Sequence, residues 1–402
     1  MRAAPREPRR RSAGSKITRV TSTLVTVPML DSYQFSVGRV AATTKVIVQV
    51  ETTDGVVGVG ETFPAWTKQI LDGYVGPRAV GEDPFNLERI TSKCLPTNAN
   101  PSLPYVDVFH LLALGGLETA LWDAMGKTTG LPAASLMGGV YRTKVPFSDY
   151  VFVAGNGGTP EDHIRAVVKY SRELVTRYRS PSLEFKVGVL EPRHDIAMVG
   201  AVREAVGEGV ALRVDANCAW SESTALRTVR ELERYGLANV EEPCGTLEAD
   251  AKVRRSMRTP VSAHSTRVSD VASYGLDAVV VNPLQVGGFA RLKKQVAVAE
   301  DRGLDIWLHS RAELGFATAA YMHFAAANRY LIHPNQTLIR PTEHTLTREG
   351  KPRFMDGFME VPLGPGLGVT LDEAALEKYA GVFREEGESD WLGGAGQSPP
   401  FY

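Results

Sequence analysis

The fold of this 402-residue chain is decided by five short segments: LEFKVG (183–188), LRVDAN (212–217), NVEEP (239–243), PVSAHS (260–265) and DIWLHS (305–310). Each segment reads as a strand that ends near one reactive side chain, and these are Lys186, Asp215, Glu241, His264 and His309. The first four lie about 23 to 29 residues apart, close to the roughly 31 residues of one βα unit in an eight-fold barrel. Since barrel enzymes carry their active sites at the C-terminal ends of the strands, this spacing predicts an active site at the barrel mouth.

Three more strand candidates bring the number to eight: VPFSDYVF (145–152), DAVVVNP (277–283) and RYLIHP (329–334). Amphipathic helical patterns such as 194–209 and 221–236 lie between the candidates and end at glycine, as short surface helices do. An open doubly wound sheet is the alternative, but no GxGxxG motif opens a helix after the first strand. The pattern therefore predicts an α/β fold with a parallel barrel over 145–340.

The part of the chain before the barrel reads as an α+β domain over 17–140. It begins with the β-rich runs 17–27 and 44–62, and the pair Asp54-Gly55 marks a hairpin turn in the second run. The stretch 29–44, rich in Gly, Ser and Thr, is expected to be a mobile loop. Helical spacing of apolar residues over 105–130 follows.

Composition favours an enzyme acting on a small molecule. The formal net charge is -1 with mixed charges, which gives no reason to expect nucleic acid or a membrane as a partner. Cys94, Cys218 and Cys244 lack metal-ligand or CxxC spacing, so a reducing, cytoplasmic location is expected. No apolar run approaches the length of a membrane span. Residues 1–16 are basic without an apolar core and are expected to form a disordered tail rather than a secretory signal.

The strand-end residues suggest metal chemistry. Asp215 and Glu241 end neighbouring strands, where their carboxylates could share one divalent cation, and His264 on the next strand could be a third ligand. Two carboxylates that converge without a cation would repel each other and raise one pKa. A pair of salt-bridged acids and a hydrogen-bonded core histidine remain the alternatives.

Lys186 and His309 are candidates for proton transfer. A lysine that is desolvated near a metal has a lowered pKa, which suits a general base. A salt bridge from Lys186 to Asp215 is the alternative. His309 ends a later strand, so in a closed barrel it could approach a substrate from the opposite side.

The runs ALWDAMGKTTGLPAASLMGG (120–139), FKVG (185–188), VDANCAW (214–220), VEEPCG (240–245) and VPLGPGLGVTLD (361–372) together resemble the enolase superfamily, in its mandelate racemase and glucarate dehydratase branch. The resemblance covers nearly the whole chain. It implies a modified TIM (β/α) barrel under an α+β capping domain, with 341–402 completing both. It also implies removal of the proton α to a carboxylate, with magnesium, or manganese or another divalent metal, holding the ene-diolate.

The resemblance gives individual residues their expected roles. Asp215, Glu241 and His264 match the metal ligands, Lys186 the second lysine of a KxK motif and usual base, and His309 the histidine base of the seventh strand. Asn217 is similar to a substrate contact. The phrases FKVGVL, EEPCG and HFAAAN most resemble glucarate dehydratases, which implies dehydration of an acid sugar, and superfamily members are often homo-oligomers.

The chain departs from the superfamily pattern at three positions. Glu184 stands where the first lysine of KxK is expected, His264 replaces an acidic or amide ligand, and Asn282 replaces the aspartate that orients the histidine base. A nitrogen ligand makes manganese, iron or zinc more plausible. Without the aspartate, His309 should be a weaker base.

Substrate recognition is expected from the cap and from the loop after His309. The stretch 29–44, with Gln34, Phe35 and Arg39, and the segment 61–66 should close over the barrel mouth. Arg311 could bind a second carboxylate of a diacid in bidentate fashion, and a surface salt bridge is the alternative. The leading hypothesis is an acid-sugar dehydratase. A racemase or epimerase of a hydroxy acid and a non-catalytic binding protein are the alternatives.

Overall fold

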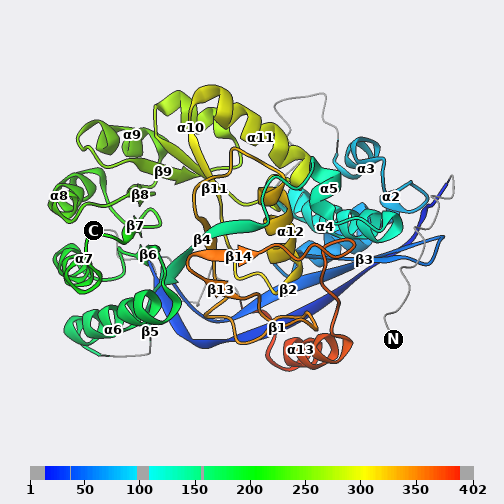
Figure 1. Ribbon diagram of the computed structural model, residues 1–402, viewed down its shortest axis with the longest axis horizontal. Helices are drawn as coiled ribbons and strands as arrows, with labels where there is room; N and C mark the ends of the chain where they lie inside the picture. Colours follow the sequence, from blue (N-terminus) through cyan, green and yellow to red (C-terminus); the bar gives the residue numbers. More distant parts are fainter. Residues whose placement is uncertain (1–13, 37, 97–107, 155–157, 390–402) are drawn as a thin grey trace.

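The computed structural model describes residues 14–36, 38–96, 108–154 and 158–389, and it consists of a barrel with a second, smaller layer packed across its mouth (Figure 1). The smaller layer is a sheet in the order β3-β2-β1-β5, backed by helix α4 (Val108–Thr129). Its strands are β1 (Ile17–Phe35), β2 (Gly38–Thr52), β3 (Val57–Thr62) and β5 (Val153–Ala154). Shorter helices follow β3 and α4, namely α1 (Thr67–Ile70), η1 (Leu71–Val75), α2 (Gly76–Ala79), α3 (Leu87–Cys94) and α5 (Ala133–Met137).

Within the described residues, eight parallel strands form the barrel. They are β4 (Lys144–Val151), β6 (Ser182–Lys186), β7 (Ala211–Asp215), β8 (Asn239–Glu241), β9 (Val261–His264), β10 (Ala278–Val281), β11 (Asp305–Leu308) and β12 (Asn335–Thr337). Neighbours pair in register from β4 through β11, and β12 pairs with β4. The Leu308 amide on β11 donates to the Asn335 side chain on β12, which joins the two ends. The strands are buried on both faces, as expected of parallel strands covered by helices.

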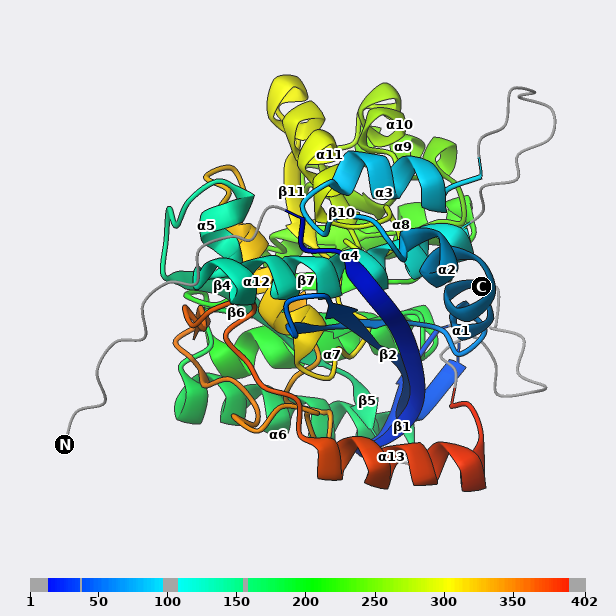
Figure 2. The same cartoon turned by 90° about the vertical axis from the view of Figure 1, so that its right-hand side faces the viewer.

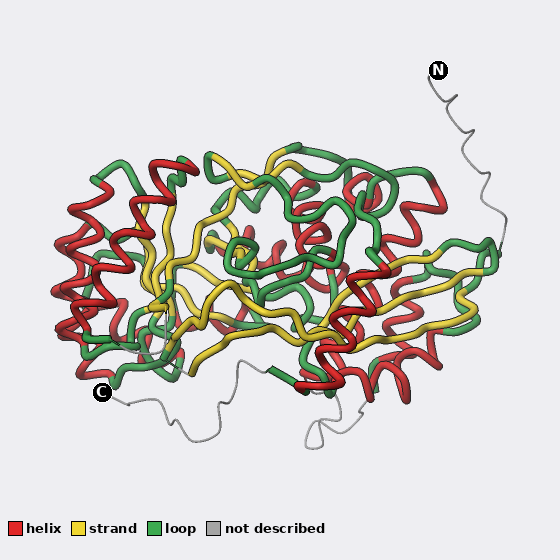
Figure 3. The backbone as a smooth tube through the Cα atoms, turned by 90° about the horizontal axis from the view of Figure 1, so that it is seen from below, coloured by secondary structure: helices red, strands yellow, loops and turns green. Residues whose placement is uncertain are grey.

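Helices between the strands form the outer layer of the barrel (Figure 3). They are α6 (Pro160–Tyr178), α7 (Pro192–Val206), α8 (Glu222–Leu232), η2 (Glu233–Tyr235), α9 (Leu247–Arg255), α10 (Val268–Tyr274), α11 (Phe289–Arg302) and α12 (Phe316–Ala326). Side-chain oxygens of Thr159, Ser221 and Thr246 cap the first turns of α6, α8 and α9. Glycines with positive φ follow α7, α10 and α11.

The mobile loop expected over 29–44 is wrong, because this stretch belongs to one long hairpin. Strand β1 runs to Phe35 and β2 begins at Gly38, and Tyr33 and Gln34 also pair with β5. The apolar side chains of Met29, Phe35 and Val40 are buried against the barrel mouth, so packing stabilises an extended backbone that Gly, Ser and Thr content alone does not predict.

The eighth barrel strand also differs from its prediction. Residues 329–334 form a turn followed by irregular backbone, and the strand is the next three residues, Asn335–Thr337. The apolar run RYLIHP therefore marked the approach to the strand, whose own residues are polar. Gln336 bonds to carboxylates in the barrel interior, and the Asn335 side chain bonds to the backbone of β11 and β4.

The segment after the barrel packs against both the barrel and the sheet of the cap. Strands β13 (Phe354–Met355) and β14 (Phe358–Glu360) form a hairpin that pairs antiparallel with β4. Helix α13 (Glu373–Glu386) then lies along β1 (Figure 2).

Most of the basic stretch expected to be disordered, residues 1–13, lies outside the described residues. Ser15 is described, and its hydroxyl donates to Asp54 at 2.8 Å. No helix among the described residues is both long and apolar enough to cross a membrane.

Candidate active site

Strand register places the reactive side chains at one end of the barrel. Lys186 on β6 is level with Asp215 on β7, and Asp215 is level with Glu241 on β8. Since alternate residues of a barrel strand face the interior, Glu184 and Arg213, two residues earlier, face the interior one layer deeper. The structure thus places three of the five strand-end residues side by side on adjacent strands, and His264 at the end of β9 and His309 just after β11 lie at the same end of the barrel.

Three buried carboxylates converge beside Lys186. Oxygens of Glu184, Asp215 and Glu241 all lie within 4.8 Å of one another, which is close enough to share a metal ion. His264, which the sequence placed as the third ligand, lies outside this group, and the third carboxylate of the group is Glu184. Three hard carboxylate oxygens suit magnesium better than a site with an imidazole ligand.

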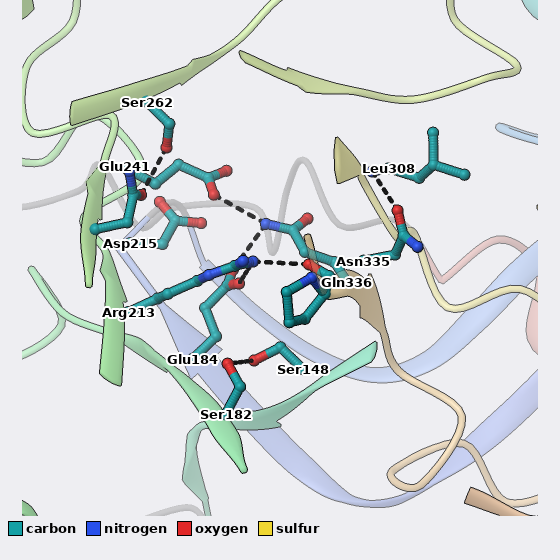
Figure 4. A network of polar contacts seen from close by, with 12 residues as sticks. Ser148, Ser182, Glu184, Arg213, Asp215, Glu241, Ser262, Leu308, Asn335 and Gln336 are labelled. Carbon is teal, nitrogen blue, oxygen red and sulfur yellow. Dashed lines mark hydrogen bonds and ion pairs between the residues drawn. The ribbon is translucent and has the colours of Figure 1, made fainter. Parts of the chain in front are cut away.

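Neighbouring side chains hold these carboxylates in place (Figure 4). The Gln336 amide from β12 donates to Glu184 at 2.7 Å and to Glu241 at 2.9 Å. Arg213 lies 3.9 Å from Glu184 and stacks over Trp307. Burial raises the pKa of Glu184, and burial together with Asp215 raises the pKa of Glu241 well above its usual range. The carboxylates therefore exceed the nearby cations, and a divalent ion would balance the excess.

Lys186 forms an ion pair with Asp215, which is the salt bridge that the sequence left open as an alternative. Burial favours the neutral amine, but Asp215, Glu241 and Glu184 outweigh it and raise the pKa of Lys186. The carboxylates by themselves therefore raise this pKa, and the lowered pKa predicted for a lysine that is desolvated near a metal stays a prediction. Asn217 fixes the other side of Asp215, because its backbone and side-chain N–H groups donate to the two carboxylate oxygens at 2.8 and 3.0 Å.

Among the described residues, no carboxylate pairs with the ring of His309. Asn282 donates to the His309 backbone carbonyl at 3.3 Å and accepts from the amides of Leu284 and Gln285, so its side chain organises a turn. Nδ1 of His309 is buried without a hydrogen-bond partner. Burial, His264 and Arg311 lower the pKa of His309 well below its usual range, so the ring is neutral.

A cavity of about 50 Å³ opens between these groups and the cap. Its polar wall holds Lys186, Asn217, His309, Ser310 and Arg311, and its apolar wall holds Phe35, Tyr150, Phe152 and Leu338. Gln34, a predicted substrate contact, does not line this cavity, and it pairs in β1 with Arg39 of β2. The hairpin tip lies directly above, where the Ser36 hydroxyl donates to the Asn217 carbonyl at 3.1 Å.

The segment 61–66 contacts the loop after β11. Glu61 is buried and accepts from the amides of Leu314 and Ala317 at 2.6 and 3.1 Å, at the start of α12. Lys45 of the cap donates to the Arg311 carbonyl, and both cations lie over the Phe63 ring. The cap thus fixes the backbone that carries His309 and Arg311.

Sequence reasoning missed Glu184, Arg213 and Gln336 as parts of the site. The signal for the first two was their place two residues before Lys186 and Asp215, which puts them on the same strand face. Glu184 was interpreted only as the loss of a lysine. Gln336 gave no local signal, because its role depends on closure of the barrel.

Comparisons with known proteins place both parts of the chain. Residues 17–138 match the mandelate racemase / muconate lactonizing enzyme N-terminal domain, and residues 166–375 match the family described as enolase C-terminal domain-like. A probable glucarate dehydratase of Streptomyces coelicolor is 30% identical over 83% of this chain and 84% of its own length. Muconate cycloisomerase 1-1 of Acinetobacter lwoffii is 29% identical over 90% of this chain and 96% of its own.

Solved structures agree with this placement. An enolase from Streptomyces coelicolor, described as a putative sugar isomerase, is 32% identical with a TM-score of 0.85 and covers 93% of this chain and 99% of its own. An enolase from Thermobispora bispora, complexed with magnesium and formate, is 26% identical with a TM-score of 0.82 and covers 92% and 93%. The capped barrel, the ordered motifs and these matches show that the chain belongs to the enolase superfamily, among the mandelate racemase and muconate lactonizing enzymes.

Proposed function

We propose that this protein removes the proton α to a carboxylate of an acid sugar and eliminates the β-hydroxyl as water. The observation that carries the proposal is that Lys186 and His309 line one cavity beside the cluster of Glu184, Asp215 and Glu241. The likeness to a probable glucarate dehydratase supports dehydration, whereas the likeness to a muconate cycloisomerase supports only the shared proton chemistry.

The three carboxylates are the proposed ligands of magnesium, with manganese as the alternative ion. When bound, the cation supplies positive charge for the substrate carboxylate and for the charge that develops on it, and it competes with the Lys186 ammonium for Asp215. Gln336 and Asn217 keep the carboxylates oriented, because each donates hydrogen bonds to them from the side.

Lys186 and His309 are the proposed proton carriers. Lys186, once neutral, accepts the α proton as the C–H bond breaks. His309 donates the proton with which the β C–O bond breaks, so that hydroxide leaves as water. His309 is neutral in the structure, and an anionic substrate beside it favours its protonation. The two residues come from β6 and β11, which are not neighbours in the sheet.

The cationic wall of the cavity favours a substrate with a second acidic group. Arg311 lines the cavity, and Lys45 is buried directly behind it against the Arg311 carbonyl. A planar guanidinium binds a carboxylate through two parallel hydrogen bonds. Aldarates carry a carboxylate at each end and are therefore the first substrates to test.

The test is a panel of aldarates and aldonates incubated in D₂O with magnesium or manganese. NMR would follow exchange of the α proton and loss of water in the same sample. Formation of a dehydrated keto acid from one member supports the proposal. Absence of both exchange and water loss with every acid would contradict it and leave the chain as a binding protein.

Racemisation or epimerisation is the second candidate, because proton carriers from two separated strands suit removal on one face and delivery on the other. Exchange of the α proton without loss of water, together with appearance of the opposite configuration, would identify this reaction.

A further inference from the structure

The catalytic cavity is too small for the substrates proposed above. Its volume is about 50 Å³. Pockets for small molecules usually begin near roughly 300 Å³. A six-carbon acid therefore needs space beyond the walls that the closed cap provides.

A second hollow of about 240 Å³ lies next to the cavity, and we call it the side groove. It is lined by Leu30, Tyr33, Phe152, Ala166, Tyr170 and Arg340, among others. Phe152 lines both the cavity and the groove. The two volumes together approach the roughly 300 Å³ at which ligand pockets begin.

The same three chain segments line both spaces, each shifted by two residues. On β1 the lining passes from Phe35 in the cavity to Tyr33 in the groove. After β12 it passes from Leu338 to Arg340, and around β5 it passes from Phe152 to Ala154. Because alternate residues of an extended chain share a face, the extended stretches 33–35 and 152–154 continue the cavity surface sideways, toward helix α6. The turn after β12 lines the adjoining edge of both spaces.

Phe152 is the side chain that separates the two spaces. Its ring stacks on Tyr150, with centroids 5.3 Å apart, and lies 5.2 Å from the Tyr33 ring at a tilted angle. Neither contact includes a hydrogen bond, so a rotation of the ring breaks van der Waals and aromatic contacts within the buried cluster that also contains Phe35 and Leu338. Each aromatic pair is worth about 0.5–1.5 kcal/mol beyond the area that it buries.

The chemistry of the groove suits a hydroxylated carbon chain. Aromatic faces of Tyr33, Phe152 and Tyr170 can pack against C–H groups, while tyrosine hydroxyls and Asp31 can bond to hydroxyls. Burial raises the pKa of Tyr33 to about 12, so its hydroxyl remains a donor at neutral pH. Arg340 forms an ion pair with Asp149, with 2.5 Å between Nε and Oδ1, so this side of the groove is held in a fixed position.

We propose that the side groove is a second compartment of the active site, which holds the distal hydroxylated part of an acid whose reacting carboxylate occupies the catalytic cavity. Phe152 turns aside to admit the chain. This inference rests on the proposed function, because it requires that acid sugars bind at the cavity.

The experiment fills the groove from its exposed edge. Ala166 is an exposed residue of α6, and Ala166→Trp would place an indole in the groove without touching the cavity. The matched control is Ala238→Trp, an exposed alanine just before β8, at the opposite end of the barrel strands. Calorimetry with the magnesium-loaded protein would compare lactate, which has three carbons, with the six-carbon acids of the panel.

We expect Ala166→Trp to weaken binding of the six-carbon acids by about tenfold or more and to leave lactate within about twofold. Ala238→Trp should change neither. Phe152→Ala should retain or strengthen binding of the long acids, because it joins the two spaces permanently. If Ala166→Trp and the unsubstituted protein bind the long acids equally well, the proposal for the groove is wrong, whereas the proposed function is unaffected. Failure of the unsubstituted protein to bind any acid would overturn the proposed function as well.

Discussion

The imidazole ring of His264 packs against that of His309, with centroids 4.6 Å apart and planes inclined at 44°. His264 ends β9, and its backbone N–H donates to Glu242 at 3.2 Å. Burial and Arg311 lower the pKa of His264 to about 4, so two neutral rings face each other. The contact with the His264 ring therefore positions His309, a role that the superfamily pattern gives to an aspartate at the position of Asn282.

Removal of the His264 ring should slow selectively the step that His309 assists. His264→Ala removes the ring and should slow the reaction that His309 assists, whereas His264→Phe retains a ring and should preserve most of it. Denaturant unfolding should show a loss of about 1 to 3 kcal/mol for the alanine variant. ¹⁵N NMR of His309 would show whether its ring becomes mobile, and equal defects in both variants would mean that the imidazole nitrogens matter instead.

Metal affinity should depend on Glu184 and not on His264. Glu184→Gln removes one of three converging carboxylates, so we expect magnesium and manganese to bind at least about tenfold more weakly. His264→Gln should leave the affinity unchanged. Glu242→Gln is a matched control, because this half-buried neighbour lies outside the cluster. Calorimetry and manganese EPR measure the affinity without turnover, and the reverse ranking would restore His264 as a ligand.

Replacement of Lys186 should abolish exchange of the α proton. Lys186→Ala removes the proposed base, and general bases contribute a factor of about 100 to 10,000 in rate. Lys186→Arg is the informative control, because it keeps a cation beside Asp215 but cannot be deprotonated. Exchange in D₂O at the rate of the unsubstituted protein in either variant would remove Lys186 from the mechanism.

His323 should make the fold sensitive to acid. It is fully buried, accepts from the Ala134 amide at 3.2 Å and lies 3.0 Å from the Leu367 carbonyl. Burial lowers its pKa from 6.5 to about 4. Between these values the unfolded chain binds a proton that the folded chain excludes, so stability falls as pH falls, by up to about 1.4 kcal/mol per pH unit.

His323→Gln provides the comparison for this prediction, because an amide can make the same two hydrogen bonds without titrating. Urea unfolding at several pH values should give a shallower dependence for the variant between pH 6.5 and 4. Parallel curves for the two proteins would show that His323 does not contribute to acid sensitivity.

Most barrel strands could be predicted because each is a short apolar run bounded by turn residues. The strands β6 to β11 coincide with predicted segments, and the end positions of Lys186, Asp215 and Glu241 follow from them. The strand β12 could not be found in this way, because Asn335, Gln336 and Thr337 are polar. The hairpin over 29–44 could not be predicted either, because its stability comes from packing on the barrel rather than from its own composition.

The sequence by itself determined the barrel, its cap and the edge at which chemistry occurs, because alternation and spacing are local properties of the chain. Only the tertiary structure decided that Glu184 joins Asp215 and Glu241, and that His264 leaves them for His309. Those choices depend on how far each side chain reaches across a closed barrel and on which charges lie opposite. The side groove likewise arises where β1, β5, α6 and the turn after β12 meet, and no single segment encodes it.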